Sequence, residues 1–429
     1  YIFLRQRDLS QLYRSSVVVL SLIFTVIIYL MGNRTRFRDV FYTYAQFQEV
    51  SWDSVSENVY MNMRAPYSRP YQVELQEGYT VKPVTGAYYY GNDNQVRFTG
   101  DEACKVDISH LEDATRVTVR DVPAFEPRYF QMDKTVKNED QIGFYGSLEI
   151  DHGKISGEIT SQFKEKMENC TVFFNDKLIY LGDVEPGQTV EVGNYPVLEY
   201  PKNHSFDVAS YLSGQSAFDQ ANIEDDAYVE AVEKTNLLSF YLDYYMPSYL
   251  SAARVVGIKT NSGSHSGLIR AGDVEGRTVA SSNVDVYSSE DEILYRQATQ
   301  RQPKVISGNY DENSNALFGM DPVTLEYSLG SDIWIQRLTM DFVSDEFLQN
   351  GSGTLLKFSG NIYFYNHSTG SFDKQEPAKR DYDSADLAPY LSPGNTITVK
   401  YVYENNSEYN WDVLLPVLNV MGRTIDDRD

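Results

Sequence analysis

Residues 172–192 read VFFNDKLIYLGDVEPGQTVEV, and this stretch is the clearest guide to the fold class of the chain. The apolar runs Val172–Phe174 and Leu178–Tyr180 consist of residues that favour strands, and Asn175-Asp176-Lys177 between them is typical of a hairpin turn. The following GDVEPGQ segment predicts a loop because it contains two glycines and a proline, and Thr189–Val192 predicts the next strand. The stretch therefore indicates antiparallel β-structure.

The sequence before this stretch continues the same pattern. Ser147–Ile150 alternates between polar and apolar side chains, Asp151-His152-Gly153 is typical of a turn, and Ile155–Ile159 resumes the alternation. Four or more antiparallel strands within about 50 residues are typical of a small immunoglobulin-like sandwich. We therefore expect an Ig-like β-sandwich over residues 141–205.

Short strand-like runs also occupy the sequence on both sides. Their spacing of about 8–12 residues between turn signals is typical of β-sandwiches. We expect one β-sandwich over residues 39–140 and a C-terminal β-sandwich over residues 253–429, whereas the polar segment Glu290–Arg301 predicts a short helix or a linker. The predicted strands are Tyr71–Leu75, Tyr79–Val84, Gln95–Phe98, Cys104–Ile108, Thr115–Val119, Ala253–Lys259, Thr278–Val286, Ile333–Phe342, Gly353–Tyr365 and Thr396–Tyr403.

One segment departs from the β pattern and predicts a helix. Residues 222–246 begin with Asn222, a good capping residue, and Glu224-Asp225-Asp226 places negative charge near the positive end of the helix dipole. Apolar residues then recur near helical spacing until Pro247 ends the pattern. We expect a helical segment over residues 206–252 with one packed α-helix. A helix whose free face binds a partner is the alternative.

The longest apolar run is VVVLSLIFTVIIYLM, residues 17–31, with arginines on both flanks. A helix of this length rises about 27 Å with its flanks, which is close to the roughly 30 Å of a hydrocarbon core. We expect a transmembrane helix over residues 15–33 and a cytoplasmic turn over residues 1–14. A cleaved signal peptide and a buried helix are the alternatives, and Leu30 is large for a cleavage position. Arginines balance across the run, so charge alone leaves its orientation open.

Composition limits the class of protein. The chain has 429 residues, enough for two or three domains, and a net charge of −24, which argues against binding nucleic acid. Its 34 tyrosines favour strands and a sheet-rich body. The two cysteines, Cys104 and Cys170, are able to pair only in an oxidising compartment, and their spacing does not decide whether they do.

The sequence contains no catalytic signature. It lacks a nucleophile elbow, a phosphate-binding loop and a dinucleotide fingerprint, and its five histidines are not at ligand spacing. Asp311–Asn315 begins like a calcium loop, but Ala316 and Pro322 occupy the positions that need Gly and Glu. A polar surface turn is the simpler interpretation, with a looser cation site as the alternative. We expect no enzyme activity, no cofactor and no metal site.

Aromatic residues offer the candidate binding surface. Tyr88, Tyr89 and Tyr90 are consecutive, so side chains point to both faces of a strand. Tyr363 and Tyr365 precede a turn that begins at Asn366 in the segment GNIYFYNHSTGSFD. These six residues are the candidate contacts for carbohydrate or for a partner. Core packing is the alternative, because aromatic residues are good strand formers.

Three segments carry a resemblance to known proteins. Residues 1–39, YIFLRQRDLSQLYRSSVVVLSLIFTVIIYLMGNRTRFRD, resemble a group of uncharacterised bacterial membrane proteins with a short Arg- and Asp-rich cytoplasmic turn. Residues 153–192, with Leu181-Gly182-Asp183 followed by Pro186-Gly187, are similar to the Ig-like unit of those proteins. From about residue 330 the sequence resembles the galactose-binding-like jelly roll.

The resemblance implies an arrangement rather than an activity. It implies that Tyr1–Leu4 is the tail of a preceding helix and that the β-rich body lies outside the cell. It offers no catalytic residues. The chain departs from the group in its high tyrosine content and in Met167-Glu168-Asn169, where the group has a more apolar step.

These observations predict a mainly β protein with tandem Ig-like and jelly-roll sandwiches after one transmembrane helix. We expect it to be located at the bacterial cell membrane with most of the chain extracytoplasmic. Its expected role is non-catalytic interaction, adhesion or envelope assembly. The alternatives are a carbohydrate-binding surface protein and an accessory subunit of an envelope transporter or secretion complex. The expected partners are the lipid bilayer and membrane proteins or surface glycans, and not nucleic acid.

Overall fold

The structure of the chain, a computed structural model, is mainly β, which confirms the predicted fold class at this level. The predicted cytoplasmic turn and transmembrane helix, residues 1–33, lie outside the described residues except for Ser21, Phe24 and Thr25. No helix in the described part of the chain is long and apolar enough to cross a membrane. The described residues are 21, 24–25, 39–84, 87–90, 96–99, 105–151, 154–201, 203–218, 223–246, 252–259, 267–269, 274–288, 294–297, 302–317, 319, 321–349, 355–403 and 412–424.

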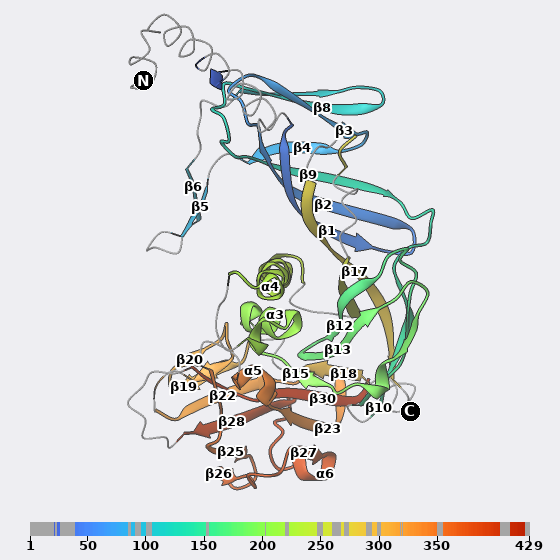
Figure 1. Cartoon of the computed structure of the whole chain (residues 1–429). Helices are drawn as coiled ribbons and strands as arrows, with labels where there is room; N and C mark the ends of the chain where they lie inside the picture. The colour runs from blue at the N-terminus through green and yellow to red at the C-terminus, as the bar shows by residue number, and fades with distance from the viewer. Residues whose placement is uncertain are drawn as a thin grey trace, which may run out of the picture. The chain divides into compact units, whose positions relative to one another are not determined.

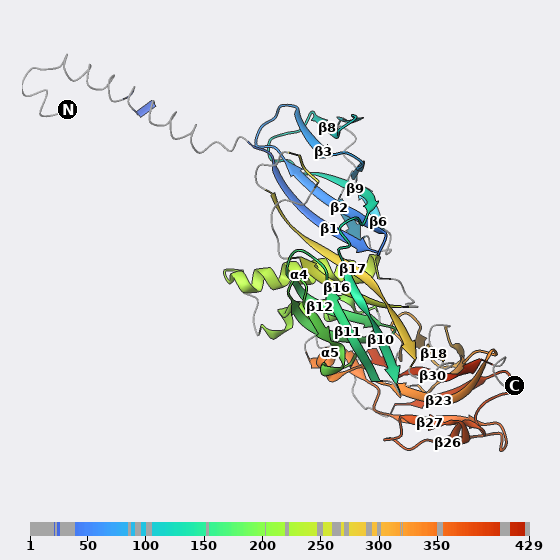
Figure 2. The same ribbon diagram turned by 90° about the vertical axis from the view of Figure 1, so that its right-hand side faces the viewer.

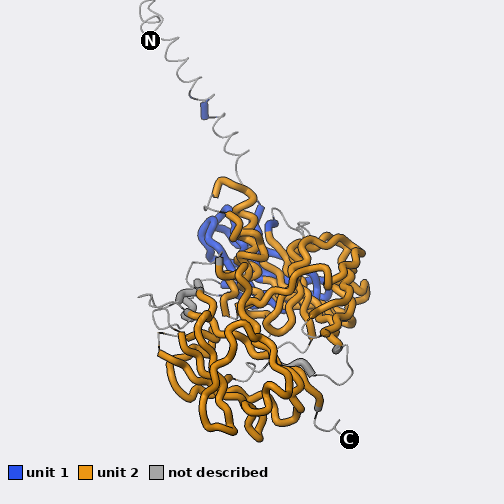
Figure 3. Tube along the Cα trace, turned by 90° about the horizontal axis from the view of Figure 1, so that it is seen from below, with its two compact units in different colours: residues 1–44, 60–131, 263–275 blue, residues 45–59, 132–262, 276–429 orange. Residues whose placement is uncertain are grey.

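The chain divides into two compact units, which Figure 3 colours separately. The strands β1 (Phe41–Val50), β2 (Ser54–Arg64), β9 (Arg128–Lys137) and β17 (Val274–Ser288) contribute residues to both units. The limits of the units fall within these strands, because the strands pair with segments distant in the sequence, and the expected domain boundaries at residues 140, 205 and 252 stay a prediction. Unit 1 contains residues 1–44, 60–131 and 263–275, and unit 2 contains residues 45–59, 132–262 and 276–429.

Unit 1 contains a three-stranded antiparallel sheet in the order β3–β8–β7 and a separate hairpin, β5–β6. Alternate residues of β3 and β8 are buried, among them Val73, Leu75 and Val117, as expected for strands with one face in a core. The five strands predicted between residues 71 and 119 are present with ends shifted by a few residues. The five are β3 Tyr71–Gln76, β4 Thr80–Val84, β6 Val96–Thr99, β7 Lys105–His110 and β8 Ala114–Arg120, and β5 Ala87–Tyr90 is a further strand.

The N-terminal part of unit 2 is built around the predicted hairpin (Figure 1). β12 (Met167–Phe174) and β13 (Lys177–Val184) pair as antiparallel neighbours, and Phe174 lies opposite Lys177 across a two-residue turn. The strands continue in the order β15–β13–β12–β16–β17, and β10 pairs with both β11 and β17. A core that includes Ile150, Val172 and Val255 lies between them. The remaining bounds are β10 Phe144–Asp151, β11 Lys154–Ser161, β14 Thr189–Glu191, β15 Leu198–Glu199 and β16 Ala253–Lys259.

The helical segment contains two packed α-helices, α3 (Ser205–Ser213) and α4 (Asp226–Tyr244), instead of the one expected (Figure 1). The sequence gives little sign of α3, because nine residues are too short to show a periodic pattern, and Gly214 ends it at φ 81°. α4 is capped by Asp225, whose side chain accepts a hydrogen bond from the amide of Ala227 at 3.0 Å. The expected cap, Asn222, lies outside the described residues. Short 3₁₀ turns cover Val192–Asn194 and Gln215–Ala217.

The C-terminal part of unit 2 places two sheets on either side of one core (Figures 1 and 2). One sheet has the order β18–β30–β23–β27 and the other β19–β22–β28–β25–β26. Tyr327, Leu338 and Val399 are among the buried side chains between them. A smaller sheet has the order β20–β21–β29–β24. The bounds are β18 Leu294–Gln297, β19 Lys304–Ser307, β20 Tyr310–Asp311, β21 Ala316–Leu317, β22 Val323–Ser328, β23 Ile333–Asp341, α5 Asp345–Gln349, β24 Leu355–Lys357, β25 Asn361–Asn366, β26 Ser371–Lys374, β27 Asp381–Asp383, α6 Ser384–Leu387, β28 Thr396–Val402, β29 Asp412–Leu414 and β30 Val417–Thr424.

Two local predictions in this part were wrong. The predicted strand Gly353–Tyr365 is two strands, β24 and β25, in different sheets. The chain changes direction near Gly360, where a Cβ atom would lie 2.2 Å from the carbonyl oxygen of Val402. The polar segment Glu290–Arg301 contains a strand, β18, which is held by pairing with β30 rather than by local preference.

Candidate functional site

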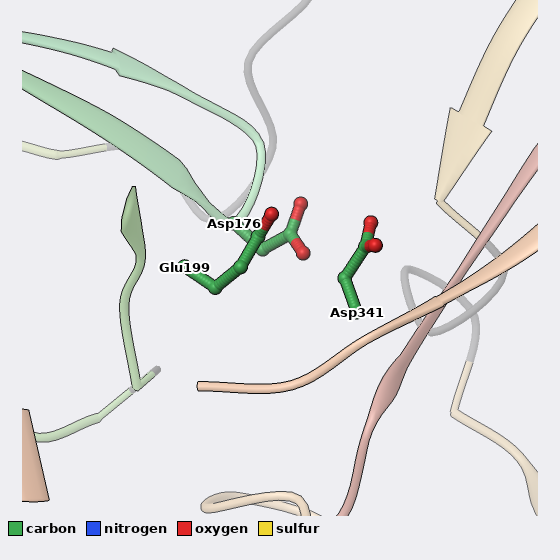
Figure 4. Close-up of side chains that lie close together, drawn as sticks. All are labelled: Asp176, Glu199 and Asp341. Atoms are coloured by element: carbon green, nitrogen blue, oxygen red, sulfur yellow. The ribbon is translucent and has the colours of Figure 1, made fainter. Parts of the chain in front are cut away.

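Three carboxylates from distant parts of the sequence meet in unit 2, and we call Asp176, Glu199 and Asp341 the carboxylate cluster (Figure 4). One oxygen of each lies within 4.8 Å of the others. Figure 4 shows the three carboxyl groups directed toward a common space. Asp176 belongs to the turn between β12 and β13, whereas Glu199 and Asp341 end β15 and β23.

The strand pairing explains why these residues meet. Glu199 lies opposite Lys177 on the neighbouring strand, and Lys177 directly follows Asp176. Glu199 and Ser344 then exchange two hydrogen bonds, from the Glu199 amide to the Ser344 Oγ at 2.8 Å and from the Ser344 amide to the Glu199 carbonyl at 2.9 Å. Because Ser344 follows shortly after Asp341, this link brings the end of β23 to the hairpin.

Lys177 supplies a positive charge inside the cluster. Its side chain is 5% exposed, and its Nζ donates to Glu199 Oε1 at 2.5 Å and to Asp341 Oδ2 at 2.9 Å. The side-chain amide of Asn419 also donates to Asp341 Oδ2, at 2.6 Å. Each of these two carboxylates therefore has one oxygen bonded to the ammonium.

Asp176 is the exception in the cluster. It is 1% exposed, and neither of its carboxylate oxygens has a hydrogen-bond partner. Glu199 Oε2 and Asn419 Oδ1 are also buried without a partner. Burial, and then the charge of Asp176, raise the pKa of Glu199 to about 9. The cluster is thus a set of hard oxygen atoms, with Asp176 buried and Glu199 and Asp341 half-buried, and it has more acidic than basic groups, an arrangement suited to holding a cation.

The sequence interpretation did not assign any of these residues to a site. Asp176 and Lys177 were read only as turn residues, and Asp341 lies 164 positions from Lys177. The available signal was a charged pair placed between the apolar runs VFF and LIY, since charged residues in such a position are buried when both strands are. Asp311–Asn315, predicted as a polar surface turn with a cation site as the alternative, forms a turn whose Asp311 carboxylate accepts from the Asn313 amide and the Ser314 hydroxyl.

A second candidate site lies on the outer side of the sheet formed by β22, β28, β25 and β26. Tyr363 and Tyr365 alternate with the buried residues Ile362 and Phe364, so their rings lie on the face away from the core. Three further residues share this face through strand pairing. We call the set the aromatic face: Tyr363, Tyr365, Phe372, Lys374 and Lys400.

The side chains of the aromatic face contact one another. The rings of Tyr365 and Phe372 lie 5.3 Å apart edge to face, and Phe372 is 38% exposed. The Nζ of Lys400 lies 5.7 Å from the centre of the Phe372 ring. Tyr363 is paired with Lys374 on one side and with Lys400 on the other. The face therefore offers rings and ammonium groups together on a hydrogen-bonded sheet.

The other predicted contact residues have different positions. Asn366 is 9% exposed, and its side chain serves the following turn by donating to Asp373 at 2.7 Å and accepting from the amides of Ser368 and Thr369. Tyr88, Tyr89 and Tyr90 lie in β5 of unit 1, and their side chains are outside the described part of the structure. The structure thus brings Tyr363 and Tyr365 together on one face.

Cys170, the cysteine in the described part of the chain, belongs to neither site. Cys170 is a free thiol, fully buried beside the backbone of Met167, and burial raises its pKa well above the usual range. Cys104 lies outside the described residues. The polar step Met167-Glu168-Asn169 forms an irregularity in β12, in which Asn169 adopts φ 51° and donates to the carbonyl of Leu212 in α3 at 2.8 Å.

Comparison with known proteins gives two family matches. Residues 143–293 match the model of a domain of unknown function, DUF8725, and residues 292–422 match that of another, DUF8815. Asp176 and Glu199 lie in the first match and Asp341 in the second. No curated protein matches the chain.

Two solved structures show a distant similarity to this chain. The yeast delta-COP-I mu-homology domain complexed with Dsl1 WxWxV peptide has a TM-score of 0.26 and 9% identity, and covers 58% of this chain and 96% of its own. The yeast delta-COP-I mu-homology domain in a second structure has a TM-score of 0.25 and 10% identity, with coverage of 58% and 98%. TM-scores this low support no conclusion about this chain.

Proposed function

We propose that this chain is a membrane-anchored, extracytoplasmic adhesion protein of the bacterial cell envelope that binds surface glycans through the aromatic face and performs no catalysis. The observation that carries the proposal is the position of Tyr363, Tyr365 and Phe372 on the side of the sheet away from the core. Rings that pack a core do not need to lie there, so their placement is better explained by contact with a ligand.

The chemistry of the face suits a sugar. Aromatic rings carry negative charge on their faces, which attracts the polarised C–H groups on one side of a pyranose. Lys374 and Lys400 add positive charge beside the rings, and this combination suits a saccharide that carries carboxylates or phosphates. The strands hold the side chains in place before binding, which lowers the entropy cost of association.

The sequence supports the cellular setting of the proposal. The apolar run at residues 15–33 supplies the anchor, and the acidic charge of the chain suits a soluble body outside the membrane. The finer fold is also part of the proposal: an Ig-like sandwich over residues 141–205 and a jelly-roll sandwich over residues 253–429. The two sheets that enclose one core in the C-terminal part support the second of these.

A glycan-binding assay with the full chain in lipid nanodiscs tests the proposal. We expect binding to acidic polysaccharides, and the Tyr363→Ala/Tyr365→Ala variant to bind about tenfold more weakly, since each ring contributes roughly 0.5–1.5 kcal/mol. Tyr287→Ala is the matched control, because Tyr287 is 58% exposed on β17 and outside the aromatic face. Absence of glycan binding by the unaltered chain, or equal binding by the double variant, would overturn the proposal.

A further inference from the structure

We infer that the carboxylate cluster of Asp176, Glu199 and Asp341 binds a calcium ion, and that this ion joins the segment matching DUF8725 to the segment matching DUF8815. This inference is independent of glycan binding, because none of these residues belongs to the aromatic face. It rests on the geometry, the unsatisfied polar atoms and the charge of the cluster.

The spacing of the oxygen atoms favours calcium over smaller ions. Ca²⁺ binds oxygen at about 2.3–2.6 Å, so two of its ligands are separated by up to about 5 Å. One oxygen from each of the three carboxylates lies within 4.8 Å of the others, which fits this range. Mg²⁺ binds oxygen at about 2.1 Å and allows only about 4.2 Å between ligands, so the upper part of a range that extends to 4.8 Å suits Ca²⁺ and not Mg²⁺.

The unsatisfied atoms point to a missing positive charge beside Asp176. Asp176 is 1% exposed and both of its carboxylate oxygens lack a hydrogen-bond partner. Burial of an ionised carboxylate without a partner is strongly unfavourable, and a bound cation removes that cost. Glu199 Oε2 and the amide oxygen of Asn419 are likewise buried and unpartnered, and both are oxygens of the type that Ca²⁺ prefers.

The charge of the cluster also fits one divalent ion. When a cation displaces the proton of Glu199, the three carboxylates and the Lys177 ammonium carry a total charge of −2, and one Ca²⁺ makes the sum zero. The Lys177 ammonium binds Glu199 Oε1 and Asp341 Oδ2, so we assign the second oxygen of each carboxylate to the ion. The ammonium and the calcium ion therefore have complementary positions rather than the same one.

The position of the site gives the ion a structural role. Asp176 and Glu199 come from the hairpin β12–β13 and its neighbour β15, whereas Asp341 ends β23. An ion held by all three connects two segments that are otherwise linked here by Lys177 and by the Glu199–Ser344 hydrogen bonds. Calcium should therefore stabilise the contact between the two matched segments.

Isothermal titration of the chelator-treated full chain with CaCl₂ tests the inference. We expect one site with a Kd of about 0.1–1 mM, the range of extracellular calcium modules, and weaker binding of MgCl₂. Asp176→Asn should weaken Ca²⁺ binding at least tenfold and abolish the rise in melting temperature that Ca²⁺ causes. Asp311→Asn is the matched control, because Asp311 lies in a turn that satisfies its carboxylate internally.

The variants remain informative about folding. Asp176→Asn removes a buried charge, so it should fold without calcium, which circular dichroism in chelator checks. Glu199→Gln should weaken calcium binding as well. The inference is overturned if the unaltered chain binds no Ca²⁺ at 10 mM, a concentration about tenfold above the expected Kd, or if Asp176→Asn binds it as tightly as the unaltered chain. Glycan binding by Asp176→Asn should be unchanged, which separates this result from the proposed function.

Discussion

Two aspartate-containing turns of unit 2 look alike in the sequence and differ in the structure. Asn175-Asp176-Lys177 joins β12 to β13, and Asp311–Asn315 joins β20 to β21. Both contain an asparagine at positive φ, 55° at Asn175 and 51° at Asn315. The Asp311 carboxylate accepts two hydrogen bonds within its own turn, whereas the Asp176 carboxylate is buried and has none. The composition of each segment therefore predicts a turn, whereas the burial and hydrogen bonding of its carboxylate depend on the residues packed around the turn.

Loss of the ammonium in the first turn should have the largest effect. Lys177→Met leaves Glu199 and Asp341 without their shared cation, and breaking a buried pair in this way costs about 3–5 kcal/mol of unfolding free energy. Urea denaturation in the presence of a calcium chelator measures this loss of unfolding free energy. Lys304→Met is the control, because Lys304 forms an exposed pair with Glu326 and should change stability by less than about 0.5 kcal/mol. Equal losses of unfolding free energy for Lys177→Met and Lys304→Met would contradict the proposed difference between the buried and the exposed ion pair.

The pH dependence of stability should have opposite signs for Glu199, which lies beside the first turn, and for Asp311, which lies in the second. The pKa of Glu199 is raised to about 9 by burial, so the native chain keeps a proton that the unfolded chain has already released. Stability in chelator should therefore fall as the pH rises from about 4.5 toward 9, by up to about 1.4 kcal/mol per pH unit. Hydrogen bonds from Ser314 and Asn313 lower the pKa of Asp311, so its contribution is present at neutral pH and is lost in acid.

Urea denaturation between pH 5 and pH 9 measures this slope. Glu199→Gln should flatten it, because the side chain no longer titrates. Asp311→Asn should leave the slope between pH 5 and pH 9 unchanged and should flatten the loss of stability below about pH 4. A Glu199→Gln variant with the original slope would show that another group is responsible.

Replacement of the two aspartates by asparagine should change the unfolding free energy in opposite directions in the two turns. In chelator, Asp176→Asn removes an uncompensated buried charge and should raise the unfolding free energy by about 1–2 kcal/mol. Asp311→Asn weakens two hydrogen bonds and should lower it by about 0.5–1.5 kcal/mol. Thermal unfolding of both variants is the measurement. A loss of stability in both would mean that the Asp176 carboxylate is compensated without an added cation.

The smallest effect should come from the asparagines at positive φ. Glycine adopts this conformation without strain, and Asn175 Oδ1 has no partner, so Asn175→Gly should change stability by less than about 0.5 kcal/mol. Asn315 accepts from the Tyr310 hydroxyl and donates to the carbonyl of Leu415, each at 3.0 Å. Asn315→Gly should therefore cost about 1–2 kcal/mol, measured by urea denaturation. Similar stability changes for Asn175→Gly and Asn315→Gly would show that the two asparagine side chains do not differ in their contribution to stability.

Local features of the sequence predicted the parts of the fold that are local in the structure. The hairpin at Asn175 follows from two apolar runs with a turn between them, and α4 follows from a long periodic segment with an acidic start. β18 was missed because Leu294–Gln297 has no strand pattern of its own and depends on β30. α3 was missed because it is short and ends at Gly214.

The candidate sites show the same limit. Tyr363 and Tyr365 could be placed on one face from their alternation with Ile362 and Phe364. That Phe372 and Lys400 lie on the same face follows only from the register of the paired strands, which the sequence of one strand does not determine. The carboxylate cluster required three separate chain segments to meet, and no spacing rule connects Asp176 to Asp341.

The burial of Cys170 determines how its thiol reacts with oxidants and disulfides. Thiol–disulfide exchange requires a thiolate that an external sulfur atom is able to reach. Cys170 is fully buried, and its raised pKa keeps the sulfur protonated, so neither condition holds while the sheet is intact. A lone thiol of this kind is chemically silent in an oxidising compartment, and it becomes reactive toward oxidants only when β12 separates from its neighbours.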